Sequence, residues 1–130
     1  MRFDLVSPER LLLSSDVSQV DVPGIEGYFG VLAGHAPMVT TLRPGILAIY
    51  RDGQAPTRIV VEGGFAEVGP NGLTVLADNA VPVEEFDAAA LAGVIKDTEE
   101  DVADTTDGWR RDKLTRRLEQ LRSLQAALAS

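Results

Sequence analysis

The chain has 130 residues, of which 45% are hydrophobic and 25% are charged, and its net charge is −8 at pH 7. This composition is ordinary for a globular protein with its own core, whereas the negative charge argues against general nucleic-acid binding, which needs a basic surface. The absence of cysteine excludes disulfide bonds and thiolate chemistry.

Up to residue 84, short runs rich in Val, Ile and Leu alternate with Gly, Pro, Asn and Asp, which is typical of β-strands joined by tight turns. Asp52-Gly53 and Asn71-Gly72 favour the positive φ of hairpin turns, and Gly63-Gly64 indicates a strand junction or a bulge. So short a region favours two small packed sheets over a wide barrel. Strands are expected around Phe3–Val6, Arg10–Ser14, Ser18–Val22, Tyr28–Val31, Met38–Thr41, Gly45–Arg51, Thr57–Glu62, Gly64–Val68 and Leu73–Ala77.

After Pro82 the spacing of the apolar residues becomes helical. Asp87 precedes an alanine-rich run and is expected to be the N-cap or a first-turn acid of a first helix. The helix carries apolar and small residues at helical spacing, namely Leu91, Val94, Ile95, Thr98 and Val102.

A second helix is expected from Trp109 to about Ala129, with Asp107 or Thr106 as its cap. Five leucines form one stripe along it: Leu114, Leu118, Leu121, Leu124 and Leu128. The stripe, together with an acidic first helix and a basic second one, predicts an antiparallel helical hairpin. Exposed ion pairs add little, so the leucines must dominate the pairing.

The predicted fold class is therefore α+β. An N-terminal antiparallel β-sandwich of two small sheets is expected over residues 1–84, and a C-terminal two-helix hairpin over residues 85–130. The expected hinge lies near Val81-Pro82-Val83-Glu84, because the residue before a proline is held out of the helical region.

The sequence offers little catalytic chemistry. His35 is the one histidine, and no nucleophile–base motif or zinc-ligand spacing surrounds it. The glycine-rich stretch 24–30 lacks the Lys-Ser/Thr ending of a phosphate loop and precedes a strand. We expect no catalytic residue, cofactor or metal, and a small hydrolase on a β-sandwich is the weakest of the alternatives.

Five segments carry a family resemblance by their order and spacing. They are Phe3–Glu9, Val20–Pro37, Leu42-Arg43-Pro44-Gly45, Gly63–Val68 and Thr74–Asp78. Together with the helical hairpin that follows, they make the chain resemble the ε subunit family of bacterial F-type ATP synthases over essentially its whole length. The resemblance implies a sandwich of about ten strands in two sheets and a non-catalytic rotor subunit of the central stalk, which couples γ to the c ring.

The resemblance also implies where partners bind. The c-ring contact falls on Glu26, Gly27, Tyr28, Phe29, Gly30 and Val31, and the γ contact on Ser7, His35, Ala36, Pro37 and Met38. The subunit is then peripheral on the cytoplasmic face of the bacterial inner membrane. No apolar run approaches the ~20 residues of a membrane span, and the start of the chain is unlike a signal peptide, so direct membrane insertion is not expected.

The C-terminal region departs from the family's ATP-binding pattern, since Ala90 stands where those members carry an arginine. Alanine makes no charge-assisted contact with phosphate, so ATP binding is not expected. The alternative within the family is a mainly regulatory subunit that inhibits ATP hydrolysis, with the second helix docking on the α and β subunits. Its candidate docking residues are Arg110, Arg111, Lys113, Arg116, Arg117 and Arg122.

Overall fold

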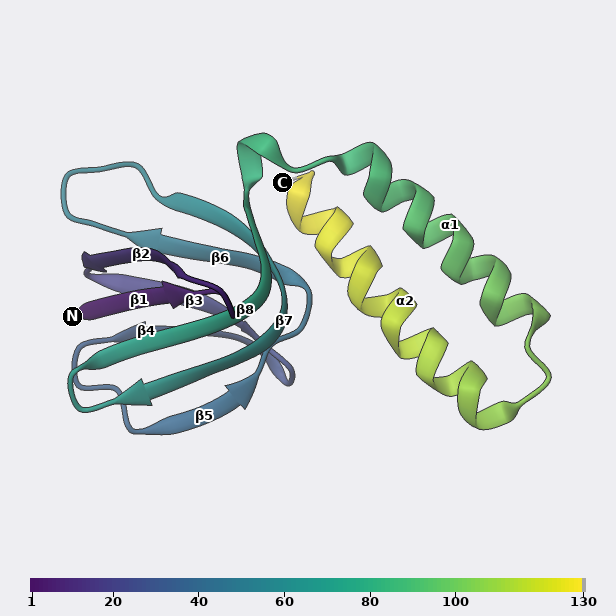
Figure 1. The fold of residues 1–130 in the computed structure, drawn as a ribbon, viewed down its shortest axis with the longest axis horizontal. Coiled ribbons are helices and arrows are strands. Elements are labelled where there is room, and N and C mark those ends of the chain that lie inside the picture. Colours follow the sequence, from purple (N-terminus) through teal and green to yellow (C-terminus); the bar gives the residue numbers. More distant parts are fainter. Residues whose placement is uncertain (130) are drawn as a thin grey trace. The chain divides into compact units, whose positions relative to one another are not determined.

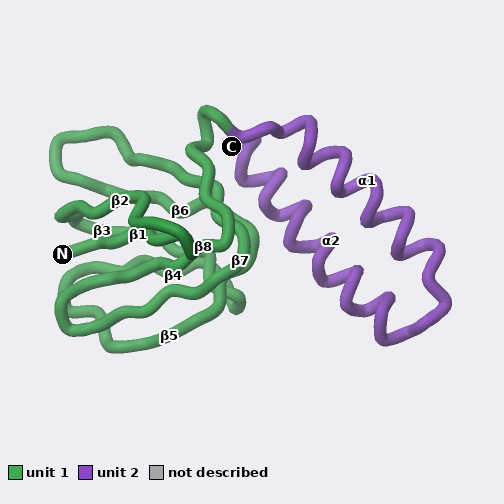
Figure 2. The backbone as a smooth tube through the Cα atoms, in the orientation of Figure 1, with its two compact units in different colours: residues 1–85 green, residues 86–130 purple. Residues whose placement is uncertain are grey.

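The computed structural model describes residues 1–129, and the chain forms two compact units, Met1–Glu85 and Phe86–Ser130 (Figure 2). The first unit is built of strands and ends in a short 3-10 helix, Val83–Glu85 (Figure 1). Its strands are β1 (Arg2–Val6), β2 (Leu11–Asp16), β3 (Gln19–Gly24), β4 (Gly27–Leu32), β5 (Met38–Thr41), β6 (Gly45–Tyr50), β7 (Thr57–Gly69) and β8 (Gly72–Pro82).

The α+β class and the sandwich are confirmed, but the strand arrangement differs from the prediction. The described residues contain eight strands, and hydrogen bonds join them in one sheet in the order β2-β1-β8-β7-β6-β3-β4, with β5 pairing β7. The sheet is also not wholly antiparallel, because β1 runs parallel to β8, from Arg2↔Gly72 to Val6↔Leu76. These two strands are remote in sequence, so no tight hairpin forces them to run antiparallel.

The sheet remains continuous because of a bend in β7. Two strands predicted on either side of Gly63 are one strand, and both Gly63 and Gly64 have positive φ, 68° and 98°. A Cβ at Gly64 would lie 1.8 Å from the carbonyl oxygen of Leu76, so only glycine fits there. Before the bend β7 pairs with β6, and after it with β5, so one long strand serves both layers.

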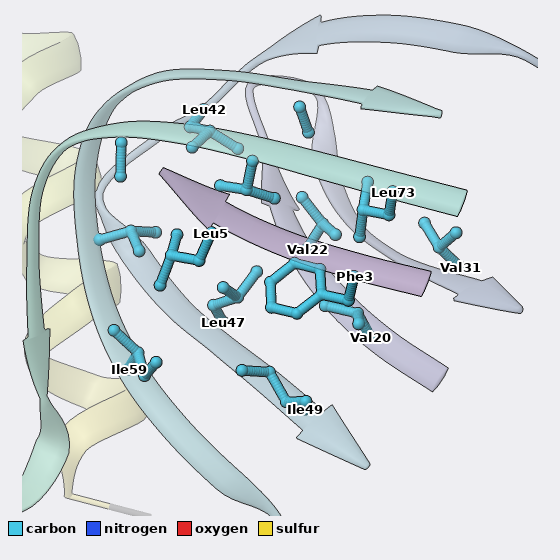
Figure 3. Packing of buried hydrophobic residues seen from close by; sticks show 14 of the residues in the cluster. Phe3, Leu5, Val20, Val22, Val31, Leu42, Leu47, Ile49, Ile59 and Leu73 are labelled. Carbon is cyan, nitrogen blue, oxygen red and sulfur yellow. The ribbon is translucent and has the colours of Figure 1, made fainter. Parts of the chain in front are cut away.

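The core lies between the folded halves of this sheet. Figure 3 shows Phe3 of β1, Val20 and Val22 of β3, and Leu47 of β6 directed into one interior. Along β1 and the first half of β8 every second residue faces inward, as the alternation of Phe3 and Leu5, or of Leu73, Val75 and Ala77, illustrates. Burying each large side chain contributes about 1.5–3 kcal/mol.

The predicted turns are present with one shift. Gly53 has the expected positive φ of 73°. The β7–β8 hairpin, however, pairs Gly69 with Gly72, so its two loop residues are Pro70 and Asn71 rather than Asn71 and Gly72. A Cβ at Gly72 would lie 2.0 Å from the carbonyl oxygen of Arg2, so this glycine serves the close approach of β1 to β8.

The second unit consists of α1 (Ala88–Asp104) and α2 (Gly108–Leu128), which run side by side in opposite directions (Figure 1). The predicted caps are confirmed: the Asp87 side chain accepts from the Ala90 N–H, and Asp107 accepts from the Trp109 N–H. The residues buried in this unit are Leu91, Ile95, Thr98, Leu118, Leu121 and Leu124. Val94, which the sequence placed at helical spacing with Leu91 and Ile95, is 41% exposed instead.

Candidate interaction surfaces

Tyr28 is held in a fixed orientation at the start of β4. Its hydroxyl accepts a hydrogen bond from the Ile46 N–H at 2.8 Å, and its hydroxyl oxygen lies so near Gly45 that a Cβ there would come within 2.5 Å of it. The side chain is nevertheless 49% exposed. A residue with an anchored hydroxyl and an exposed ring presents apolar area at a low entropic cost, which is typical of interface anchors.

The other residues predicted to contact the c ring alternate along the same strand. Glu26 and Gly30 are exposed and Phe29 is half-buried, packing against the core. Val31 is fully buried and its side chain belongs to the core. Strand geometry explains the pattern, since successive side chains point to opposite faces. Contacts through side chains are therefore restricted to the outward residues of this segment.

The segment His35–Met38 approaches the same strand. The rings of Phe29 and His35 lie 6.2 Å apart between centroids, and the Nδ1 of His35 is 2.7 Å from the carbonyl oxygen of Ala36. His35 and Met38 border a shallow groove of about 290 Å³ together with residues 26–29. The structure thus brings part of the predicted γ contact beside the predicted c-ring contact.

Ser7 lies apart from that groove. It closes the β1–β2 turn, where its hydroxyl accepts from the Arg10 N–H at 3.2 Å. Met1 lies at the other end of β1 and lines the same pocket as His35. The six residues of extended chain from Met1 to Ser7 span about 20 Å. Ser7 and His35 therefore lie at opposite ends of the sandwich, and the predicted γ residues do not form one cluster.

The sequence reasoning missed an apolar row close to Ser7. Phe65 pairs with Leu76, Leu76 with Val6, and Val6 with Leu11, so four strands carry one line of apolar side chains. All four residues alternate with inward-facing neighbours, and Leu11 and Phe65 are 57% and 37% exposed. The sequence did contain a sign of this row. An apolar residue at a strand position where a polar one is expected, such as Leu76 between Val75 and Ala77, indicates apolar surface on the outer face of the sheet.

On α2, half of the basic residues predicted for docking already have partners. Arg111 donates to the carbonyl oxygen of Thr105 at 2.6 Å, Lys113 lies 5.5 Å from the ring centroid of Trp109, and Arg122 pairs with Glu99 at 2.9 Å. Trp109 is itself 71% exposed. The remaining three are exposed without a partner in residues 1–129: Arg110, Arg116 and Arg117.

A polar cluster lies on the outer side of β3. Asp21 accepts from Gln19 at 2.7 Å and from the hydroxyl of Tyr50 at 3.0 Å. This hydrogen bond and the charge of Asp21 raise the pKa of Tyr50 above its usual value. Gly30 leaves the cluster uncovered, since a Cβ there would come within 3.3 Å of Asp21 and 3.2 Å of Gln19.

Within residues 1–129, no three His, Asp or Glu side chains gather as metal ligands do. The helices of this part of the chain are too short or too polar to cross a bilayer. What the structure offers is exposed apolar and basic surface on two compact units, which is the architecture of a subunit that binds other proteins in an assembly.

Comparisons with known proteins agree with this class. Residues 1–83 match the family described as ATP synthase, Delta/Epsilon chain, beta-sandwich domain. The ATP synthase epsilon chain 1 of Nitrobacter hamburgensis is 53% identical over 126 residues, covering 97% of this chain and 92% of the relative. The epsilon chain of Parvibaculum lavamentivorans is 49% identical, with 96% and 95% covered.

Solved structures give the same result. A chain in the mitochondrial ATP synthase of Euglena gracilis, from a structure of OSCP, F1 and c ring, superposes with a TM-score of 0.81 at 32% identity, covering 97% of this chain and 79% of that one. This chain belongs to the ATP synthase delta/epsilon family. It is a non-catalytic subunit of the central stalk, and its partners are other subunits of the membrane-associated ATP synthase.

Proposed function

We propose that this chain couples the γ subunit to the c ring, so that the three rotate as one body and pass torque between proton flow and ATP chemistry. The observation that carries the proposal is the outward row of Phe65, Leu76, Val6 and Leu11. The sandwich has a complete core without these side chains, so their exposure calls for a partner.

The γ subunit is assigned to this row and to Ser7 beside it, with His35–Met38 as an outlying contact. An apolar row flanked by polar side chains is typical of a stable protein interface. The row crosses four strands of one sheet, so the backbone that carries it is rigid, and little entropy is lost on binding.

The c ring is assigned to the β3–β4 turn and the outward residues of β4, with Tyr28 as the anchor. Gly27 and Gly30 carry no side chain, which allows the backbone of a partner to approach closely. A subunit held through the ring is peripheral to the membrane, and we assign it to the cytoplasmic face of the bacterial inner membrane. Exposure of the chain to protease in inverted, but not in right-side-out, membrane vesicles tests this assignment.

Binding to γ is tested by size-exclusion chromatography of the purified proteins. The chain and γ are expected to elute as a one-to-one complex without nucleotide. Leu11→Asp places a charge in the apolar row and is expected to separate the two proteins, since an unpaired charge is costly in an interface. Val94→Asp, a matched change at an exposed valine of α1, is expected to leave the complex intact. Two separate peaks for the unmodified proteins at micromolar concentration would refute the γ assignment.

Coupling is tested with a truncated chain. Residues 1–84 are expected to fold alone, because they contain all eight strands and the whole core cluster. They are also expected to restore proton-driven ATP synthesis to a complex that lacks this subunit. Loss of all coupling with this fragment, despite a cooperative unfolding transition of the fragment, contradicts the proposal.

The exposed basic face of α2 favours a second candidate function, the inhibition of ATP hydrolysis. Arg110, Arg116 and Arg117 are exposed on the same helix as the exposed Trp109 and have no partner within residues 1–129, which suits docking on an acidic surface of the α or β subunit. Replacing the three arginines by alanine is expected to raise the hydrolysis rate of the assembled complex. Equal rates for the variant and the unmodified complex exclude this role.

We propose further that the chain does not bind ATP in the physiological range. Ala90 supplies no cation, and its N–H already donates to Asp87 at 3.0 Å, so a carboxylate occupies the N-terminus of α1. A missing charge-assisted hydrogen bond lowers affinity roughly 10- to 150-fold. Titration calorimetry is the test, and a dissociation constant near or below micromolar would overturn the proposal. Ala90→Arg is expected to recover part of the binding.

A further inference from the structure

Arg43 lies between β5 and β6 with an unusual hydrogen-bonding state. Among the residues that the structure describes, its Nε–H is buried and has no acceptor, and Arg43 takes part in none of the ion pairs. Buried donors in native proteins nearly always have a partner, and an unpaired one destabilises the fold. The chain has more acidic than basic residues, yet no carboxylate within residues 1–129 forms an ion pair with Arg43.

The backbone around Arg43 is fixed in place. The Arg43 N–H donates to the carbonyl oxygen of Pro23 at 3.0 Å, and the following Pro44 and Gly45 are buried. A residue before proline is also restricted to extended conformations. The backbone that carries the guanidinium is therefore rigid, while the residue as a whole is only half-buried.

Arg43 lies at the same end of the sandwich as the β3–β4 turn. Leu42 forms a bridge with Gly24, and the Ile25 N–H donates to the carbonyl oxygen of Thr41 at 2.9 Å. Gly45 packs under the anchored Tyr28. Arg43 thus adjoins the surface assigned above to the c ring, which also exposes 44% of Ile25.

We propose that Arg43 is a specificity-determining residue that accepts a carboxylate from the polar loops of the c ring. This inference rests on the proposed coupling function. The two terminal nitrogens of a planar guanidinium match a carboxylate in a bidentate arrangement, and the buried Nε restricts the inner part of the side chain, which reduces the entropy lost on binding. The Nε is itself out of a partner's reach, so the contact with the carboxylate falls on the terminal nitrogens of this half-buried residue.

The test uses the full chain in complex with γ and measures its binding to purified c ring in lipid nanodiscs by biolayer interferometry. Arg43→Met keeps the length and apolar stem of the side chain and removes the donors. It is expected to weaken ring binding by about tenfold or more, while the melting temperature of the isolated chain stays the same or rises. Raising the salt concentration is expected to weaken the unmodified complex more than the variant.

Lys96→Met is the matched control, because Lys96 is an exposed cation of α1 outside the assigned surfaces, and it is expected to leave ring binding unchanged. Equal ring affinity for Arg43→Met and the unmodified chain overturns the inference. So does a fall in melting temperature that accounts for the loss of binding, or an equal salt dependence. Failure of the unmodified complex to bind the ring would instead refute the proposed coupling function.

Discussion

The two units of this chain are stabilised in different ways. The sandwich unit closes a core to which all of its strands contribute, and three of its strand pairings join segments remote in sequence, as the pairing of Val6 with Leu76 illustrates. The hairpin unit buries three residues from each helix. Ordering each residue costs about 1–2 kcal/mol of backbone entropy, and so few buried side chains offset less of it. The sandwich is therefore suited to be a rigid coupling element, whereas the hairpin is suited to change its conformation.

The largest effect is expected from Gly64→Ala in the sandwich. A Cβ would clash with the Leu76 carbonyl at 1.8 Å, and the φ of 98° is unfavourable for alanine. We expect a loss of more than about 3 kcal/mol, measured by urea denaturation followed by circular dichroism. Gly69→Ala is the control, because its Cβ would meet nothing within 4 Å. Similar losses for both variants would show that the bend in β7 does not need glycine.

The next effect is expected from Leu121→Ala in the hairpin. Leu121 is 1% exposed, and such a truncation costs about 2–5 kcal/mol. If the hairpin is the less stable unit, this loss unfolds α1 and α2 while the sandwich stays folded. Native-state hydrogen exchange distinguishes the units, with protection lost in residues 88–128 only. Ser123→Ala, at an exposed position of α2, serves as the control. Loss of protection in both units at once contradicts independent stability.

A smaller effect is expected at the start of α2. Asp107→Ala removes the side chain that accepts from the Trp109 N–H at 3.1 Å, and the loss of such a cap costs about 1 kcal/mol. The fluorescence of the one tryptophan reports on this helix end directly. Thr106→Ala, at the neighbouring residue that the sequence left as an alternative cap, is expected to change stability by less. The reverse order would mean that the cap is assigned to the wrong residue.

The smallest effect is a pH dependence in the sandwich. Because the hydrogen bond and charge of Asp21 raise the pKa of Tyr50 in the folded state, this group contributes stability that is fully present below the unfolded pKa of about 10. The contribution is lost as pH rises through the higher folded pKa. Tyr50→Phe is expected to flatten the decline of the melting temperature above pH 10. A decline of the same slope in both proteins argues against the interaction.

Much of the hairpin followed from local sequence. Asp87 and Asp107 act as the predicted caps, and the helices begin within a residue or two of the expected positions, because capping and helical spacing are short-range effects. Val94 shows the limit of this reasoning. It has helical spacing with the buried Leu91 and Thr98 of α1 but is 41% exposed, because the direction from which the partner helix packs decides which side chains are buried.

For the candidate site, sequence reasoning located the segments but not their surroundings. It assigned Glu26–Val31 and His35–Met38 to separate partners, and the fold brings part of each segment to one groove. It included Val31, which belongs to the core, and it omitted Phe65 and Leu11. Whether a residue of a strand faces the core or solvent depends on the register of its neighbours, which no local pattern specifies.

The sequence by itself determined the two-part organisation, the change from strand to helical spacing after Pro82, and the lack of a catalytic constellation. These follow from residue spacing, turn chemistry and composition, which act within a few residues along the chain. Only the tertiary structure decided the parallel pairing of β1 with β8, the single bent strand β7, the outward apolar row and the buried, unpaired Nε of Arg43. Each depends on contacts between residues remote in sequence, and such contacts form only when the whole sheet closes around its core.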